Sequence, residues 1–282
     1  MTYLKFIFVM LLLSMFTVQF LSAQDWADLN RFKKENANQV LPTTGEKRVV
    51  FMGNSITEGW VNIHPEFFAG KFYLNRGISG QTTPQMLLRF RADVIKLKPK
   101  VVVILAGTND IAGNTGPSTL EMIEDNIISM AQLAKANDIK VILCSVLPVY
   151  DYPWKTGLEP AEKIIALNKL IKNYAAKSEM IYLDFFSAMV DERNGLKSEY
   201  SKDGVHPNEA GYYVMEPLTE KAIEKAFNTN KPVTPTKTVI HKKKTTSYKK
   251  PIATKKPTTS KKPTTTITTK KPITTKPVVP KK

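Results

Sequence analysis

The chain has 282 residues, enough for one or two domains, and carries 41 Lys and Arg against 25 Asp and Glu, a net charge of +16. The whole excess lies in residues 231–282, where 16 Lys stand among Thr and Pro without one acidic residue, so residues 1–230 are balanced in charge. The basic total therefore does not indicate a nucleic-acid-binding domain, because single-strand binders interleave aromatic with basic side chains and Tyr248 is the one aromatic residue of this segment.

Residues 1–23 are typical of a secretory signal peptide. Lys5 precedes an apolar run that extends to Phe20, and small residues, Ser22-Ala23, follow it. The run is shorter than the ~20 apolar residues of a membrane-spanning helix. We therefore expect cleavage near Ala23 and no transmembrane segment afterwards, with a retained membrane anchor as the alternative. This predicts a protein that is secreted or lies in the periplasm or cell envelope.

Residues 24–230 are predicted to form one domain in which strands alternate with helices. Strands are expected at residues 48–52, 71–75, 100–106, 140–146 and 180–183, and helices at residues 84–97, 118–137, 160–177 and 207–227. Ser118 and Glu121 are expected to form a capping box. Single helices between strands imply right-handed crossovers and a parallel sheet covered on both faces. We therefore expect an α/β fold, a three-layer α/β/α sandwich with a central, mostly parallel sheet of five strands.

Loops at the carboxyl ends of parallel strands carry function in such sheets, and three of them hold candidate residues. Ser55 follows the first strand across Gly53, which allows a sharp turn, and stands at a helix entry. There it can act as a nucleophile and donate its own N–H, a plain helix cap being the alternative. Gly80 lets the backbone after the second strand approach a ligand. Asn109 follows the third strand, and its amide can stabilise an oxyanion if the loop faces Ser55.

A fourth loop, before the last helix, supplies an imidazole. Of three histidines, one lies in the basic C-terminal segment and His64 lies in a loop after the first helix, so an imidazole base is expected at His206. Pro207 disfavours the α conformation at His206 and makes it the expected N-cap, where the helix dipole favours a neutral ring. Asp203, three residues earlier, can orient the ring. Asp184, at the end of a strand, is the alternative acid.

In order and spacing these four segments resemble the conserved blocks of the SGNH, or GDSL, hydrolases, over residues 48–227. The resemblance implies the flavodoxin-like sandwich of that family and a serine esterase that acts through an acyl-enzyme. It assigns the nucleophile to Ser55, the Asp-x-x-His pair to Asp203 and His206, and the oxyanion hole to Ser55, Gly80 and Asn109.

One residue departs from the family pattern: the first block is Gly-Asn-Ser rather than Gly-Asp-Ser. Because that Asp transfers no proton in the family, Asn54 is expected to leave activity intact. The chain contains no Gly-x-Ser-x-Gly elbow and no His-Glu-x-x-His or Cys/His cluster, so neither an α/β-hydrolase fold nor a metal or other cofactor is indicated. Cys144 lies in an apolar strand and is expected to be an inert, buried thiol.

The substrate is less closely defined. Export, the lack of a long apolar lid and the balanced charge of the domain favour a short-chain, acetyl ester on a carbohydrate. The alternatives are a lipid ester, as for lysophospholipases or acetylhydrolases, and an inactive scaffold that binds glycan. Residues 231–282 are expected to be a disordered, Lys/Thr/Pro-rich tail that binds anionic envelope polymers, with a solvated spacer as the alternative.

Overall fold

The computed structural model describes residues 25–229. The expected signal peptide and basic tail lie outside the described residues. Within residues 25–229, no helix combines the length and the apolar character that crossing a membrane requires.

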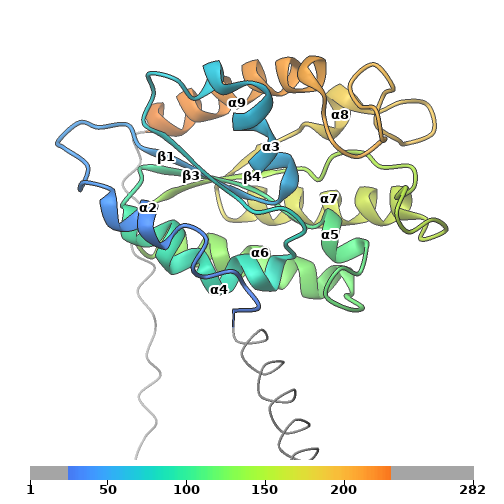
Figure 1. Cartoon of the computed structure of the whole chain (residues 1–282), viewed down its shortest axis with the longest axis horizontal. Coiled ribbons are helices and arrows are strands. Elements are labelled where there is room, and N and C mark those ends of the chain that lie inside the picture. The colour runs from blue at the N-terminus through green and yellow to red at the C-terminus, as the bar shows by residue number, and fades with distance from the viewer. Residues whose placement is uncertain (1–24, 230–282) are drawn as a thin grey trace, which may run out of the picture. The chain divides into compact units, whose positions relative to one another are not determined.

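A five-stranded parallel sheet forms the centre of the domain (Figure 1). Its strands are β1 (Val49–Gly53), β2 (Tyr73–Gly77), β3 (Val101–Leu105), β4 (Lys140–Cys144) and β5 (Ile181–Leu183). They lie in the order β2-β1-β3-β4-β5, and every neighbouring pair is parallel. This is the flavodoxin-like strand order, so the predicted fold class is confirmed.

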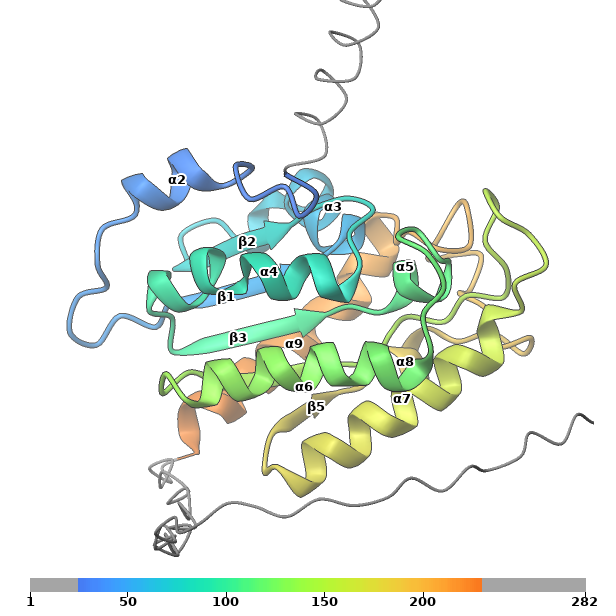
Figure 2. The same ribbon diagram turned by 90° about the horizontal axis from the view of Figure 1, so that it is seen from below.

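Helices cover both faces of the sheet (Figures 1 and 2). On one face lie α3 (Ser55–Ile63) and α9 (Glu209–Asn228), and on the other lie α4 (Thr83–Asp93), α6 (Leu120–Lys135) and α7 (Pro160–Lys177). The shorter elements are α2 (Lys33–Asn38), α5 (Thr108–Ile111), α8 (Phe186–Met189) and two 3₁₀ turns, Pro65–Phe67 and Ile95–Leu97.

The central strands are buried on both faces, as near-continuous apolar runs predict. Successive side chains of a strand point to opposite faces, so Phe51 of β1 packs in the cluster that contains Trp60 of α3. Its neighbour Val50 packs in the cluster that contains Phe90 of α4. Cys144 is buried in the first cluster, and this burial raises the pKa of its thiol. The thiol therefore stays protonated, as expected of an inert cysteine.

Most element bounds agree with prediction to within two residues. The helix expected at residues 84–97 is shorter, because α4 ends at Asp93 and the turn Ile95–Leu97 follows it. Lys98 then adopts a left-handed backbone with φ 49°, which ends the turn. The predicted cap of α6 is wrong by one residue: Thr119 is its N-cap, and the Thr119 hydroxyl accepts the N–H of Met122 at 3.2 Å.

Candidate active site

The loops after β1, β2 and β3 meet at the carboxyl end of the sheet, where α5 follows β3 (Figure 2). In the sheet, β2 lies on one side of β1 and β3 lies on the other side. The strand order therefore reverses direction at β1. Ligands bind at such a reversal of strand order in open α/β sheets. The loop before α9 reaches the same place and brings His206 to Ser55, 151 residues away in sequence.

Ser55, His206 and Asp203 form a continuous hydrogen-bonded chain. Ser55 Oγ lies 2.9 Å from His206 Nε2, and His206 Nδ1 lies 2.7 Å from Asp203 Oδ2. When Nδ1 carries the proton and donates it to the carboxylate, Nε2 is free to accept from the serine hydroxyl. The arrangement can therefore remove a proton from Ser55 and stabilise the charged ring that results.

The carboxylate of Asp203 is held by its own loop. Its Oδ1 accepts the N–H of Val205 at 2.9 Å, the N–H of His206 at 2.8 Å and the hydroxyl of Ser201 at 3.1 Å. Partial burial acts to raise the pKa of Asp203, but the hydrogen bonds from His206 and Val205 together outweigh it and lower the pKa to about 2. Asp203 is thus a fixed negative charge at neutral pH, beside the imidazole ring of His206.

Asp184, the alternative acid, and His64, the other histidine of the described residues, are both engaged elsewhere. Asp184 accepts the N–H and the hydroxyl of Ser187, at 3.0 and 2.9 Å, at the start of α8. His64 is buried at the end of α3, where its ring pairs with Glu216 of α9. The structure therefore pairs His206 with Asp203 and leaves Asp184 and His64 in structural contacts.

Ser55 is the first residue of α3, as predicted, but it is not the helix cap. The N-cap is Asn54, whose side-chain oxygen accepts the N–H of Ile56 at 3.0 Å. Gly53 does not adopt a positive φ. A Cβ at this position would lie 2.0 Å from Thr57 Oγ1 and 2.9 Å from the carbonyl oxygen of Leu105. Close packing, rather than turn geometry, therefore requires glycine before Asn54-Ser55.

The expected position of His206 at the N-cap of α9 is wrong. Asn208 is the N-cap, and its side-chain oxygen accepts the N–H of Gly211 at 3.0 Å. A short amide side chain reaches this helix donor, whereas the His206 ring is directed to Ser55 and Asp203. The ring of His206 is therefore oriented by its contacts with Ser55 and Asp203 and not by a position at the N-cap of α9.

Three hydrogen-bond donors lie in the loops around Ser55. One N–H of the Asn109 amide donates to the carbonyl of Gln81 at 2.9 Å, which fixes the amide against the loop after β2 and leaves its second N–H available. Gly80 in that loop has φ +77°. The backbone N–H groups of Ser55 and Gly80 donate to no other backbone atom of the described residues. Donors of this kind can stabilise a developing oxyanion.

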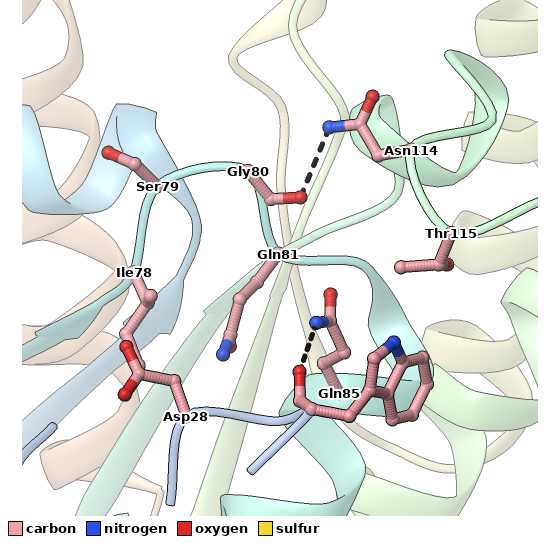
Figure 3. Close-up of a pocket in the computed structure, with 9 residues that line it drawn as sticks. Asp28, Ile78, Ser79, Gly80, Gln81, Gln85, Asn114 and Thr115 are labelled. Carbon is pink, nitrogen blue, oxygen red and sulfur yellow. Dashed lines mark hydrogen bonds between the residues drawn. The ribbon is translucent and has the colours of Figure 1, made fainter. Parts of the chain in front are cut away.

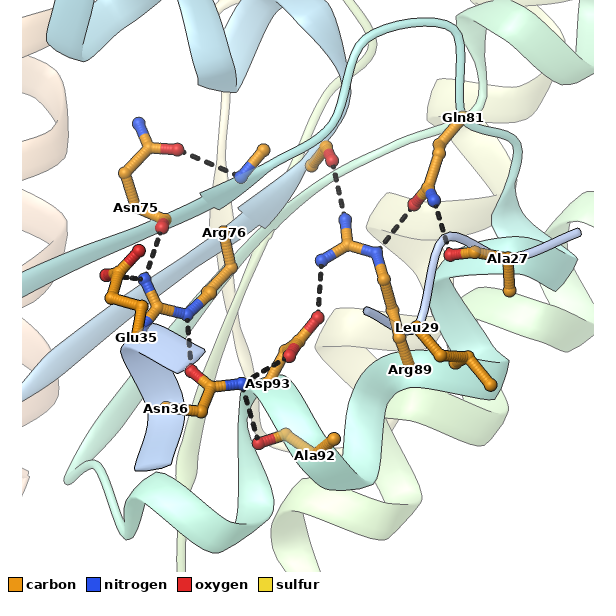
Figure 4. Close-up of polar contacts among 12 residues, drawn as sticks. Ala27, Leu29, Glu35, Asn36, Asn75, Arg76, Gln81, Arg89, Ala92 and Asp93 are labelled. Carbon is orange, nitrogen blue, oxygen red and sulfur yellow. Dashed lines mark hydrogen bonds and ion pairs between the residues drawn. The ribbon is translucent and has the colours of Figure 1, made fainter. Parts of the chain in front are cut away.

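A buried arginine that the sequence analysis missed supports two of these loops. Arg89 Nη2 donates to the carbonyl of Gly53 at 3.0 Å, Nε to Gln81 Oε1 at 2.6 Å and Nη1 to Asp93 at 3.1 Å (Figure 4). It thereby joins the end of β1 to the residue whose carbonyl holds Asn109. The signal in the sequence was an arginine on the apolar face of α4 with an aspartate four residues later.

A half-exposed indole lies beside His206. The ring of Trp154 is 49% exposed, and its centroid lies 6.0 Å from that of the imidazole. The neighbouring Tyr152 is buried and donates its hydroxyl to the carbonyl of Thr108 at 2.8 Å. Lys155 donates to the carbonyl of the residue after α5 at 2.9 Å. The loop between β4 and α7 is therefore fixed against α5 and presents Trp154 next to His206.

Residues 25–229 contain no group of three or more His, Cys, Asp or Glu side chains placed to hold a metal ion. The groups that the structure brings together at Ser55 are a hydroxyl, an imidazole and a carboxylate.

Comparison with known proteins covers the same region. The model of the GDSL-like lipase/acylhydrolase family matches residues 51–214. The crystal structure of a GDSL-like lipase (BT0569) from Bacteroides thetaiotaomicron has a TM-score of 0.70 and 52% sequence identity, over 71% of this chain and 98% of that one. The residues matched by the family model include Ser55, Gly80, Asn109, Asp203 and His206.

Three curated relatives are named for ester hydrolysis. Esterase TesA of Pseudomonas aeruginosa is 29% identical over 178 residues, 62% of this chain and 82% of that protein. Human platelet-activating factor acetylhydrolase IB subunit alpha2 is 28% identical over 182 residues, 62% of this chain and 76% of that protein. An acetylxylan esterase of Xylanibacter ruminicola is 26% identical over 214 residues, 63% of this chain and 43% of that protein.

Proposed function

The chain belongs to the GDSL-like lipase/acylhydrolase family, and we propose that it is an exported serine esterase that removes acetyl groups from carbohydrate hydroxyls. That it is a carboxylic ester hydrolase follows from the family and its relatives. One observation carries the mechanism: Ser55, His206 and Asp203 form a hydrogen-bonded chain of hydroxyl, imidazole and carboxylate. These groups stand in the order that serine-dependent acyl transfer requires.

In the proposed first step, Ser55 Oγ attacks the ester carbonyl carbon while His206 Nε2 takes the hydroxyl proton. The carbonyl electrons move to oxygen, and the N–H groups of Ser55 and Gly80 and the Asn109 amide stabilise the oxyanion. Asp203 stays ionised and stabilises the imidazolium. As the intermediate collapses, His206 protonates the leaving alcohol and the acetyl group remains on Ser55.

In the second step, water replaces the alcohol. His206 removes a proton from the water as it attacks the acetyl carbonyl carbon, and the same three donors stabilise the second oxyanion. As the second intermediate collapses, the bond between Ser55 Oγ and the acyl carbon breaks, His206 returns the proton to Ser55 Oγ, and acetic acid leaves and ionises in water. The enzyme is restored with no change in its own protonation.

Two findings support acetyl as the acyl group and carbohydrate as the alcohol. The relatives from human and Xylanibacter ruminicola are both named for acetyl esters, and the second is named for a polysaccharide. Because His206 protonates the leaving alcohol, the side chain beside it contacts the alcohol moiety, and that side chain is Trp154. An indole offers an apolar face and a polar edge, which suits the C–H face and hydroxyls of a pyranose.

Hydrolysis of a substrate panel tests this proposal. The panel contains p-nitrophenyl acetate, butyrate and octanoate, acetylated xylotetraose and a lysophospholipid. We expect acetate to be hydrolysed at least tenfold faster than butyrate, a difference of about 1.4 kcal/mol in transition-state binding, and acetate to be released from the saccharide. Faster hydrolysis of the octanoate or the lysophospholipid would favour a lipid ester instead. No hydrolysis of any ester would leave the inactive-scaffold alternative.

Export is the second part of the proposal and is supported by the basic start, apolar run and small residues of residues 1–23. N-terminal sequencing of the protein from the culture medium or envelope fraction tests it. We expect a chain that begins at Gln24. A chain that retains Met1 in a membrane fraction would support the anchor instead.

A further inference from the structure

A pocket of about 490 Å³ opens beside Gly80, next to the proposed oxyanion hole (Figure 3). Its volume is within the range of small-molecule sites. Three parts of the chain line it: the turn before α2, the loop after β2 with the first turn of α4, and the loop after α5. The residues that the argument uses are Trp26, Asp28, Gly80, Gln85 and Asn114.

Hydrogen bonds to its backbone hold the turn before α2 in place. Gln85 Nε2 donates to the carbonyl of Trp26 at 2.6 Å, and Gln81 Nε2 donates to the carbonyl of Ala27 at 2.7 Å. Figure 4 shows Gln81 between Ala27 and Arg89, which donates to its side-chain oxygen. Ala27 is 2% exposed. The turn is therefore fixed to the same Gln81 and Arg89 that support the loops around Ser55.

The helix that follows this turn is also anchored to the domain. Arg76 Nε donates to Asn36 Oδ1 at 3.0 Å and Nη1 to Glu35 at 2.7 Å, while Asn36 Nδ2 donates to Asp93 at 2.6 Å (Figure 4). The ring of Phe32 lies 4.7 Å from the Arg76 guanidinium. The segment is thus part of the folded domain, although the family match begins only at residue 51.

Several polar groups of the pocket have no hydrogen-bond partner among the described residues. The carboxylate of Asp28, the indole Nε1 of Trp26 and Oδ1 of Asn114 make no hydrogen bond within residues 25–229. By contrast, Asn114 Nδ2 donates to the carbonyl of Gly80 at 3.1 Å (Figure 3). The Trp26 side chain is 48% exposed. Two acceptors, one donor and an indole face match a saccharide, whose hydroxyls donate and accept and whose C–H face is apolar.

We propose that this pocket binds a saccharide unit of the substrate adjacent to the unit that carries the ester, with Trp26 and Asp28 as the residues that recognise it. The inference rests on the proposed function, because it extends the carbohydrate beyond the sugar next to Trp154. Gly80 connects the two sites: its N–H belongs to the proposed oxyanion hole, and its carbonyl is held by Asn114 of the pocket. A hydrocarbon chain would leave the Asp28 carboxylate without a partner.

Kinetics of Trp26→Ala and Asp28→Asn in the full chain test this site. Asp28 has φ 53°, a conformation that Asn tolerates, so Asp28→Asn removes the charge without straining the turn. We expect each variant to raise KM for acetylated xylotetraose about tenfold, as for the loss of one contact, with little change in kcat. Hydrolysis of p-nitrophenyl acetate should be unchanged, because this ester does not reach the pocket.

Leu29→Ala is the matched control, since Leu29 belongs to the same turn, is 47% exposed and does not line the pocket. It should behave as wild type on both esters. Unchanged KM for the saccharide in both Trp26→Ala and Asp28→Asn would overturn the proposal. So would an equal loss on p-nitrophenyl acetate, which indicates a structural effect on Ser55.

Calorimetric titration with unacetylated xylotetraose and chitotetraose tests binding without turnover and distinguishes the two kinds of glycan. We expect one of them to bind wild type and Leu29→Ala, and to bind Trp26→Ala at least tenfold more weakly. Binding that depends on Trp26, without release of acetate from acetylated xylotetraose, would contradict the proposed function but support the site. Absence of binding by both saccharides, or binding that Trp26→Ala does not weaken, would refute the site.

Discussion

At the scale of single residues, Asp203 has two separate tasks. Its Oδ2 accepts from the His206 ring, and its Oδ1 accepts from three groups of its own loop. Hydrogen bonds to a carboxylate favour its ionised form. The bonds within the loop therefore keep Asp203 charged and also fix the position of the carboxylate that orients the His206 ring. Asp184 is also an aspartate, but its carboxylate accepts hydrogen bonds from Ser187 at the start of α8.

This difference predicts unequal effects of two matched substitutions. Asp203→Asn is expected to lower kcat on p-nitrophenyl acetate by roughly 10³–10⁴-fold, because an amide favours the wrong tautomer of the ring. Asp184→Asn should leave kcat within about threefold of wild type, because the Asp184 side chain contacts none of the proposed reacting groups. A larger loss in Asp184→Asn would transfer the role of the acid to Asp184.

The low pKa of Asp203 predicts how stability depends on pH. Its pKa falls from 3.8 to about 2 in the folded protein. A group whose pKa is lowered by folding stabilises the native state above its unfolded pKa and loses that contribution as pH falls through its folded pKa. The side chain is 41% exposed, so solvent screening keeps the effect small. In thermal unfolding, we expect the Tm of Asp203→Asn to fall less than the Tm of wild type as the pH is lowered from 5 to 2. Parallel Tm curves would contradict the assignment.

At the scale of elements, α2 depends on polar contacts rather than on apolar packing. None of its six residues is buried. Its attachment comes from Glu35 and Asn36, which contact the buried Arg76. Burial lowers the pKa of Arg76, and the charges of Glu35 and Asp93 oppose this change. Loss of one partner would therefore leave a buried cation less well compensated.

Asn36→Ala is accordingly expected to destabilise the domain by about 1–3 kcal/mol, because Arg76 Nε and the Asp93 carboxylate both lose a partner. Lys34→Ala on the same helix is the control, since Lys34 is exposed. Urea unfolding of the two variants compares them directly. An Asn36→Ala midpoint equal to that of Lys34→Ala would show that α2 contributes nothing to the stability of the sheet.

The sequence predicted the elements whose signal is local. Apolar strands and amphipathic helices repeat with their own periods, and the short spacing from Asp203 to His206 lies within one loop. The N-cap of α9 was misplaced because Pro207 fits a helix start and only the reach of the Asn208 side chain decides the position. Local patterns of this kind specify the layers of the fold better than its helix ends.

Contacts between distant segments were not predictable from such patterns. Gln81 donates to a carbonyl 54 residues earlier, and Arg89 donates to one 36 residues earlier. Neither bond leaves a periodic signal in the sequence. For this reason the pocket at Trp26 and the support of the loop after β1 emerged only from the structure.

At the scale of the whole molecule, charge is divided between two parts of the chain. Residues 231–282 hold 16 Lys and no acidic residue, whereas residues 1–230 carry equal numbers of acidic and basic side chains. We propose that the basic segment binds anionic envelope polymers by releasing their counterions and takes no part in hydrolysis. A spacer without binding partners is the alternative.

Truncation after Asn230 tests this division. The truncated chain should hydrolyse p-nitrophenyl acetate at the wild-type rate, since every residue of the proposed mechanism precedes the cut. It should elute earlier from an acidic polysaccharide column, and retention of the full chain should fall as salt rises. Equal elution of both proteins at low salt would refute the binding role and leave the spacer.

The central claim is that Ser55 forms an acyl-enzyme, and turnover of Ser55→Ala on p-nitrophenyl acetate tests it most directly. The Ser55 side chain makes one hydrogen bond among the described residues, to His206, so the variant should unfold at the wild-type Tm. We predict a loss of about 10⁴–10⁶-fold in kcat, as for other serine nucleophiles. A folded Ser55→Ala protein that keeps a tenth of the wild-type turnover would contradict this account.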